Sequence, residues 1–122
     1  MIAGMAPALD PGRWCFVAVT RDRAPELLGA ALATFREDEG VSAIVPAALA
    51  DDAAAIFARI TLTVHSDLEG VGLTAAVAGV LAEAGIACNM VAALRHDHVF
   101  VPQADAIEAL GLLQDLAATA RG

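Results

Sequence analysis

The sequence predicts an α+β fold in which helices cover one face of an antiparallel sheet. Residues 57–65 alternate apolar and polar side chains with the period of two of a strand that buries one side. Apolar residues recur at helical spacing over 73–84 and again over 104–120. In chain order these patterns read strand, helix, hairpin and helix, which is an α+β arrangement.

The first half of the chain is predicted to contain four elements: a strand at 14–20, a helix at 25–33, a hairpin at 34–46 and a helix at 47–56. The strand is a run of β-branched and aromatic residues bounded by Gly12 and by a charged triplet. A polar turn at 36–40 joins the two arms of the hairpin. An alanine-rich composition favours a helix in the last segment.

The second half is predicted to contain five elements: a strand at 57–65, a helix at 73–84, strands at 86–94 and 98–101, and a helix at 104–120. A polar, glycine-rich break at 66–72 precedes the first helix, and Gly85 is placed to cap that helix. A polar turn at 95–97 joins the two later strands. The last helix is expected to bury a stripe of residues, namely Ile107, Leu110, Leu113, Gln114 and Ala117.

The two halves share a pattern that indicates duplication. Ala33–Asp38 resembles Ala92–Asp97, because both hold an Arg-x-Asp turn within a hairpin. Ile44–Pro46 likewise resembles Phe100–Pro102, where a proline starts the next segment. The strand–helix–hairpin–helix order is the ferredoxin-like pattern without its last strand. We therefore expect three regions: an N-terminal lead at 1–12, a degenerate half at 13–56 and a better preserved half at 57–122.

The composition counts against several classes of function. The 122 residues include 7 arginines and no lysine against 15 acidic residues, which gives a net charge of −8. This acid excess argues against nucleic acid and anionic membranes as partners. The most apolar stretch, Gly70–Cys88, is interrupted by Glu83 and is rich in alanine and glycine. No membrane span or signal peptide is predicted, and we expect a cytoplasmic location.

Two stretches of the second half resemble the ACT domain, the small ligand-sensing module attached to many enzymes of amino-acid metabolism. They are Val64–Leu73, a strand end with a polar, glycine-containing loop, and Val80–Met90, which holds a Leu-Ala-Glu-Ala-Gly-Ile junction. With the turns at 35–40 and 95–102, the chain is similar to a bacterial family of small stand-alone tandem ACT proteins, mostly of unassigned function. The resemblance covers about Leu9–Ala117. It implies a ferredoxin-like sheet that pairs with another ACT unit and an amino acid held where units meet.

The loop before the 73–84 helix is the first candidate ligand site. It consists of Ser66, Asp67, Leu68, Glu69, Gly70, Val71 and Gly72. Backbone N–H groups at a helix start lack intrahelical partners and can bind a carboxylate, while Asp67 or Glu69 can hold an ammonium group. The structural alternative is a helix entry loop in which Ser66 or Asp67 only caps the helix.

Asn89 is the second candidate, because it is a polar amide in a strand of Ala, Cys, Met and Val residues. The ACT resemblance implies that this strand faces a ligand of its own or a neighbouring unit. The structural alternative is an amide that is satisfied by adjacent backbone groups.

His65, His96 and His98 suggest a metal site, since His96 and His98 share a face if both lie on a strand. No HExxH motif, cysteine pair or carboxylate at ligand spacing accompanies them. Solvated or core-edge histidines are the simpler interpretation, and we expect no cofactor.

The sequence thus predicts a non-catalytic regulatory protein that binds a small molecule, with an amino acid as the expected ligand and a homodimer as the expected assembly. Neither nucleic acid nor a membrane is an expected partner. Two alternatives stay open. One is a metal-dependent or histidine-using small enzyme centred on the three histidines, and the other is a purely structural interaction domain.

Overall fold

The structure is a computed structural model that describes residues 4–63 and 72–121. It divides into two compact units. The inserted unit spans Gly12–Phe57, and the outer unit combines Met1–Pro11 with Ala58–Gly122. Because the outer unit is drawn from both ends of the chain, the inserted unit interrupts it in sequence. Each unit has its own hydrophobic cluster.

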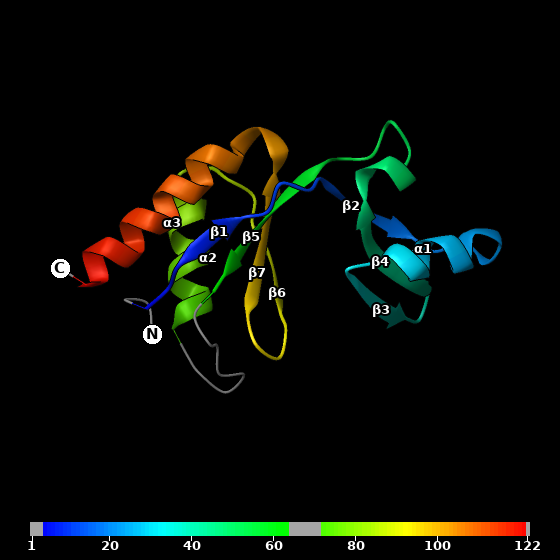
Figure 1. Ribbon diagram of the computed structural model, residues 1–122, viewed down its shortest axis with the longest axis horizontal. Coiled ribbons are helices and arrows are strands. Elements are labelled where there is room, and N and C mark those ends of the chain that lie inside the picture. Colours follow the sequence, from blue (N-terminus) through cyan, green and yellow to red (C-terminus); the bar gives the residue numbers. More distant parts are fainter. Residues whose placement is uncertain (1–3, 64–71, 122) are drawn as a thin grey trace. The chain divides into compact units, whose positions relative to one another are not determined.

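The helices are separated along the chain by strands, several of which follow one another in pairs (Figure 1). The strands are β1 (Pro7–Leu9), β2 (Trp14–Ala18), β3 (Ala33–Glu37), β4 (Gly40–Pro46), β5 (Phe57–Leu62), β6 (Asn89–Ala92) and β7 (Asp97–Pro102). The α-helices are α1 (Ala24–Ala30), α2 (Leu73–Glu83) and α3 (Ala106–Arg121). Three 3-10 turns lie at Arg21–Arg23, Ala47–Leu49 and Gln103–Asp105.

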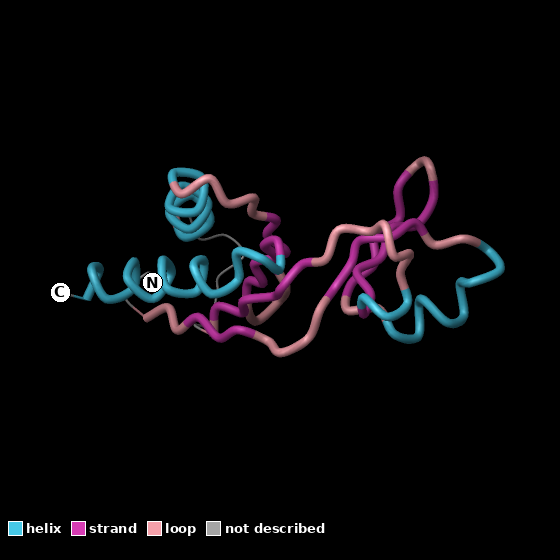
Figure 2. The backbone as a smooth tube through the Cα atoms, turned by 90° about the horizontal axis from the view of Figure 1, so that it is seen from above, coloured by secondary structure: helices cyan, strands magenta, loops and turns pink. Residues whose placement is uncertain are grey.

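The outer unit is a four-stranded sheet in the order β1-β5-β7-β6. Its strands β6 and β7 form the predicted hairpin, and α2 and α3 lie against each other and cover the same sheet face (Figures 1 and 2). The N-terminal segment, which is predicted as a lead without a strand, supplies β1. It pairs antiparallel with β5, Pro7 opposite Leu62 and Leu9 opposite Ile60. This strand completes the ferredoxin-like pattern that lacked a last strand in sequence.

The inserted unit repeats this strand order with a shorter first helix. Its strands run β3-β4-β2, all antiparallel, and Trp14 of β2 pairs with Phe57, the first residue of β5. The helix α1 packs on β4 and buries Leu27 against Ala43 and Val45. The prediction of an α+β fold with an antiparallel sheet and two related halves, the first degenerate, is confirmed.

The core of the outer unit explains the period of two in β5. Ala58, Ile60 and Leu62 are buried, while the residues between them are only partly buried. The full cluster of buried residues is Met5, Ala58, Ile60, Leu62, Leu73, Val77, Leu81, Ile86, Val99, Val101, Ala106, Ala109, Leu113 and Ala117. Met5 belongs to it, so the N-terminal segment contributes to the core as well as to the sheet.

The predicted helix over 47–56 is wrong. Over these residues, all of which the structure describes, the chain forms the 3-10 turn Ala47–Leu49 and then turns without regular helix. A helix this short is marginal unless tertiary packing stabilises it, and alanines offer little apolar surface for such packing. The inserted unit therefore has one α-helix, whereas the described part of the outer unit has two.

The predicted inner stripe of the last helix is partly wrong. Ile107 is 75% exposed and Gln114 is exposed, whereas Leu113 and Ala117 are buried and Leu110 is partly buried. The buried face runs through Ala106, Ala109, Leu113 and Ala117. The buried face thus keeps Leu113 and Ala117 of the predicted stripe and includes Ala106 and Ala109 in place of Ile107 and Gln114.

Several element boundaries also differ from the prediction. The helix expected at 25–33 ends at Ala30, because the Leu32 N–H already donates to Ile44 O at 2.8 Å as the chain enters β3. The strand expected at 86–94 is limited to β6. The helix expected at 73–84 is α2, and Gly85 has the positive φ of 74° expected for its cap. No described helix is long and apolar enough to cross a membrane.

Candidate functional site

Of the predicted ligand loop, Ser66–Val71 lies outside the described residues, and Gly72 lies within them. Gly72 is the N-cap of α2, is exposed, and has φ 99° and ψ −33°. A Cβ built there meets no atom within 4 Å, so backbone conformation and not crowding favours glycine. The first-turn N–H groups of α2 lie at this end of the helix, together with the positive end of the helix dipole.

Asn89 begins β6 and is exposed. It lies opposite Phe100 in the β6–β7 ladder, and directly opposed residues share a sheet face. Val99 and Val101, on either side of Phe100, are buried in the cluster that includes α2 and α3. The side chain of Asn89 is therefore on the helix-free face of the outer unit.

Gly72 and Asn89 lie at different ends of the outer unit. α2 begins at the same end of the outer unit as the tip of the β6–β7 hairpin and ends at the end where β6 begins (Figure 1). Asn89 is the first residue of β6 and Ala92 the last, which at ~3.3 Å per residue separates them by about 10 Å. The two candidates therefore do not converge on one point within a single outer unit.

The helix-free face also carries two polar pairs that the sequence did not predict. An Arg59 nitrogen, Nη2, lies 3.3 Å from Asp10 Oδ2, and both side chains are about one-quarter exposed or less. Thr61 Oγ1 lies 3.1 Å from His98 Nδ1, which joins β5 to β7. The alternation in 57–65 placed Arg59 and Thr61 on one face. Their partners could not be identified, because the pairing of β1 and β7 with β5 is non-local.

His98 is held as a neutral hydrogen-bonding group. Burial lowers the pKa of His98 from its ordinary value, and the positive charges of Arg59 and His96 lower it further, while Asp97 acts in the opposite direction. The lowered pKa favours the uncharged imidazole, which suits its contact with the Thr61 hydroxyl.

The three-histidine hypothesis stays a prediction, because His65 lies outside the described residues. Within residues 4–63 and 72–121, no group of three or more His, Cys, Asp and Glu residues is placed to hold a metal ion. The described histidines have other surroundings: His98 contacts Thr61, and His96 precedes β7.

The two halves each match a known family. Residues 1–60 match one ACT domain family, and residues 58–115 match another. The two matches meet at the start of β5, as expected for a pair of related domains. The chain therefore belongs to the ACT domain family, as a tandem pair of ACT domains. No curated protein sequence matches it.

Solved structures show the same architecture. The chain is 40% identical to a protein of unknown function from Vibrio cholerae, described as a possible transport protein, over 95% of this chain and 92% of that one, with a TM-score of 0.80. A protein from Agrobacterium tumefaciens is 15% identical over 93% and 89%, with a TM-score of 0.70. The ligand-free regulatory subunit of aspartate kinase from Thermus thermophilus is 11% identical over 90% and 95%, with a TM-score of 0.62. The last two likenesses show a shared fold only.

ACT domains typically bind small ligands such as amino acids in regulatory proteins. Here the two ACT matches together occupy residues 1–115. The chain is thus a tandem of domains of the kind that typically binds small ligands.

Proposed function

We propose that this protein is a non-catalytic regulatory protein that binds an amino acid at the 66–72 loop and at the strand around Asn89. The main support is the tandem ACT match, which accounts for nearly the whole sequence. The exposed, glycine-started N-terminus of α2 supports it further, since its backbone N–H groups suit an α-carboxylate. The cytoplasmic location expected from the sequence remains part of this proposal.

We further propose that the site is assembled by two copies of the chain. Within residues 4–63 and 72–121, β6 pairs with β7 alone, so its other edge can accept a strand. If β6 strands of two copies pair antiparallel about a two-fold axis, Asn89 of one copy lies near the Ala92 end of the other. In the second copy, α2 begins at that same end, so the pairing brings the start of α2 in one copy and the start of β6 in the other to the same end of the joined sheet.

In this mechanism, the ligand acts by stabilising the association of the two copies. A ligand that binds only the paired form shifts the equilibrium toward it by mass action. A separate target protein would then recognise the paired surface.

Thermal denaturation with each of the twenty amino acids tests this function. A ligand present at 100 times its Kd adds about 2.7 kcal/mol to the free energy of unfolding, which is readily measured as a rise in Tm. An absence of stabilisation by any amino acid at millimolar concentration would reject the amino-acid ligand.

The variant Asn89→Ala locates the site. It should reduce the ligand-dependent rise in Tm while leaving the unliganded Tm nearly unchanged, because Asn89 is exposed. The matched control is Gln114→Ala, which removes an exposed amide from α3. Equal responses of the two variants would exclude a role for Asn89.

A further inference from the structure

The inserted unit contains a cavity that no sequence pattern predicted. Its volume is about 460 Å³, within the range of ~300–1,000 Å³ common for small-molecule sites. The cavity is lined on one side by residues of β2 and α1 and on the other by the segment from Leu49 to Ala54. That segment is the one predicted to be a helix. The cavity thus lies where turns replace the second helix of this unit.

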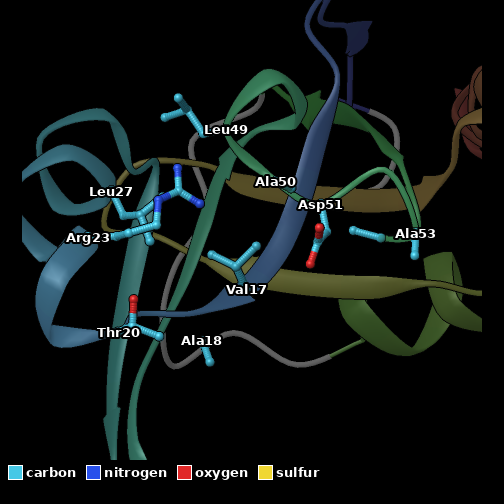
Figure 3. A pocket seen from close by; sticks show the side chains of 10 residues that line it. Val17, Ala18, Thr20, Arg23, Leu27, Leu49, Ala50, Asp51 and Ala53 are labelled. Carbon is cyan, nitrogen blue, oxygen red and sulfur yellow. The ribbon is translucent and has the colours of Figure 1, made fainter.

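The lining of the cavity combines an aliphatic surface with two charged side chains. Val17, Leu27 and Leu49 form an aliphatic floor that belongs to the core of the inserted unit. Arg23 and Asp51 also line the cavity, and Figure 3 shows them on opposite sides of Val17. A cation and an anion therefore flank a compact apolar surface.

Arg23 pairs with Glu26 at the surface. Glu26 Oε1 accepts a hydrogen bond from Arg23 Nε at 3.0 Å and a second from Nη2. A guanidinium carries five N–H donors, so this contact orients the group and leaves other donors for a ligand carboxylate. Asp51 is exposed at the far side and can accept from an ammonium group.

We propose that this cavity is a second ligand site, specific for a small zwitterion with an aliphatic body. The carboxylate would bind Arg23, the ammonium would bind Asp51, and the aliphatic part would contact Val17, Leu27 and Leu49. An apolar helix of a second copy fits less well, because it would bury both charged side chains against hydrocarbon. This site is independent of the one proposed at Gly72 and Asn89.

Methyl NMR on the full chain tests the proposal with leucine as the probe. Leucine should shift the methyl signals of Val17, Leu27 and Leu49 saturably. Two analogues of the same shape serve as controls: 4-methylpentanoate lacks the ammonium group, and 3-methylbutylamine lacks the carboxylate. Each should bind about tenfold more weakly or worse, since each loses one charge-assisted contact.

Two pairs of variants test whether leucine binding depends on the charged residues of the lining and not on nearby charged residues. Arg23→Gln and Asp51→Asn should each raise the Kd about tenfold or more. Arg21→Gln, in the same 3-10 turn, and Asp52→Asn, next along the chain, are exposed residues outside the lining and should leave the Kd unchanged. All four changes are at the surface, so the fold is expected to persist.

Three results would overturn the proposal: no methyl shift with millimolar leucine, shifts that survive the Arg23→Gln, Asp51→Asn double change, or shifts abolished by Asn89→Ala. Shifts of the same methyls with protein concentration alone would also overturn it, by showing that a second copy fills the cavity. Since Asn89→Ala should leave this titration unchanged, failure here and failure of the proposed regulatory site are distinguishable.

Discussion

Thr61 Oγ1 and His98 Nδ1 lie 3.1 Å apart and join the two central strands of the outer unit, β5 and β7. The contact lies on the helix-free face, where burial and the nearby charges of Arg59 and His96 lower the pKa of His98. The histidine thus contributes to the sheet as a neutral group.

This arrangement predicts a loss of stability in acid. Because the pKa of His98 is lower in the folded protein, the unfolded chain binds the proton more readily. The stabilisation is complete above the ordinary histidine pKa of about 6.5 and is lost as the pH falls through the folded value. Urea melts from about pH 8 down to 5 should show this decline, and His98→Asn should make it shallower. His96→Asn is the control and should keep most of the decline. Identical slopes for wild type and His98→Asn would contradict the assignment.

Because the N-terminal segment packs into the core, we expect truncation of one of its side chains to lower the free energy of unfolding substantially. Met5 is 1% exposed and belongs to the core of the outer unit. Met5→Ala should lower the free energy of unfolding by about 2–5 kcal/mol, as measured by urea denaturation. Leu94→Ala, at a position that is 67% exposed, should change it by less than about 0.5 kcal/mol. Equal effects would mean that the segment before β1 does not pack on the core in solution.

The orientation of α3 predicts that truncating a side chain on its buried face lowers the free energy of unfolding far more than truncating one on its exposed face. Leu113 is fully buried and Ile107 is 75% exposed. Leu113→Ala should destabilise the protein by about 2–5 kcal/mol, whereas Ile107→Ala should change its stability by less than about 0.5 kcal/mol. A large loss from Ile107→Ala would instead favour the stripe that the sequence predicted.

Replacing two glycines in or next to α2 by alanine should change the stability of the protein in opposite directions. Gly79 lies inside the helix, where a Cβ meets no atom within 4 Å, so Gly79→Ala should stabilise the protein by about 0.5–1 kcal/mol. Gly85 has a φ of 74°, so Gly85→Ala should destabilise it by about 1 kcal/mol through backbone strain. Thermal melts of both variants against wild type check the pair. Two changes of the same sign would contradict the cap geometry.

Local patterns predicted the local elements well. The alternation in 57–65, the helical spacing before Gly85 and the two hairpin turns each depend on residues close in sequence, and each corresponds to an observed element. The pairing of β1 with β5 depends on contacts far apart in sequence, and a strand of three residues gives almost no pattern. Stability of a helix at 47–56 likewise depends on packing that sequence does not show.

The candidate sites also differ in whether they depend on local sequence patterns or on contacts far apart in sequence. Gly72 was identified because a helix start has a local signature, and it is the N-cap of α2. Asn89 was identified because its residue type is unusual in its strand, but its distance from Gly72 follows from the topology. The cavity between Arg23 and Asp51 arises from turns that replace a helix, so no motif in the sequence could reveal it.

The hydrogen-bond pattern of β6 predicts which residue controls pairing of two copies. Ala93 N–H donates to His96 O at 3.1 Å, so the hydrogen-bonded pairs of this ladder fall at every second residue, including Val91 with His98. The backbone groups of Ala92 then point to the open edge, away from β7.

Ala92→Pro therefore removes a donor from the edge and keeps the ladder to β7 intact. We expect the variant to keep its far-UV circular dichroism and to lose self-association in sedimentation velocity. Val91→Pro is the contrasting change, because it removes a donor from the β6–β7 ladder and should lower the Tm. A wild-type association constant for folded Ala92→Pro would exclude the β6 edge as the contact between copies, and with it the shared site at Asn89.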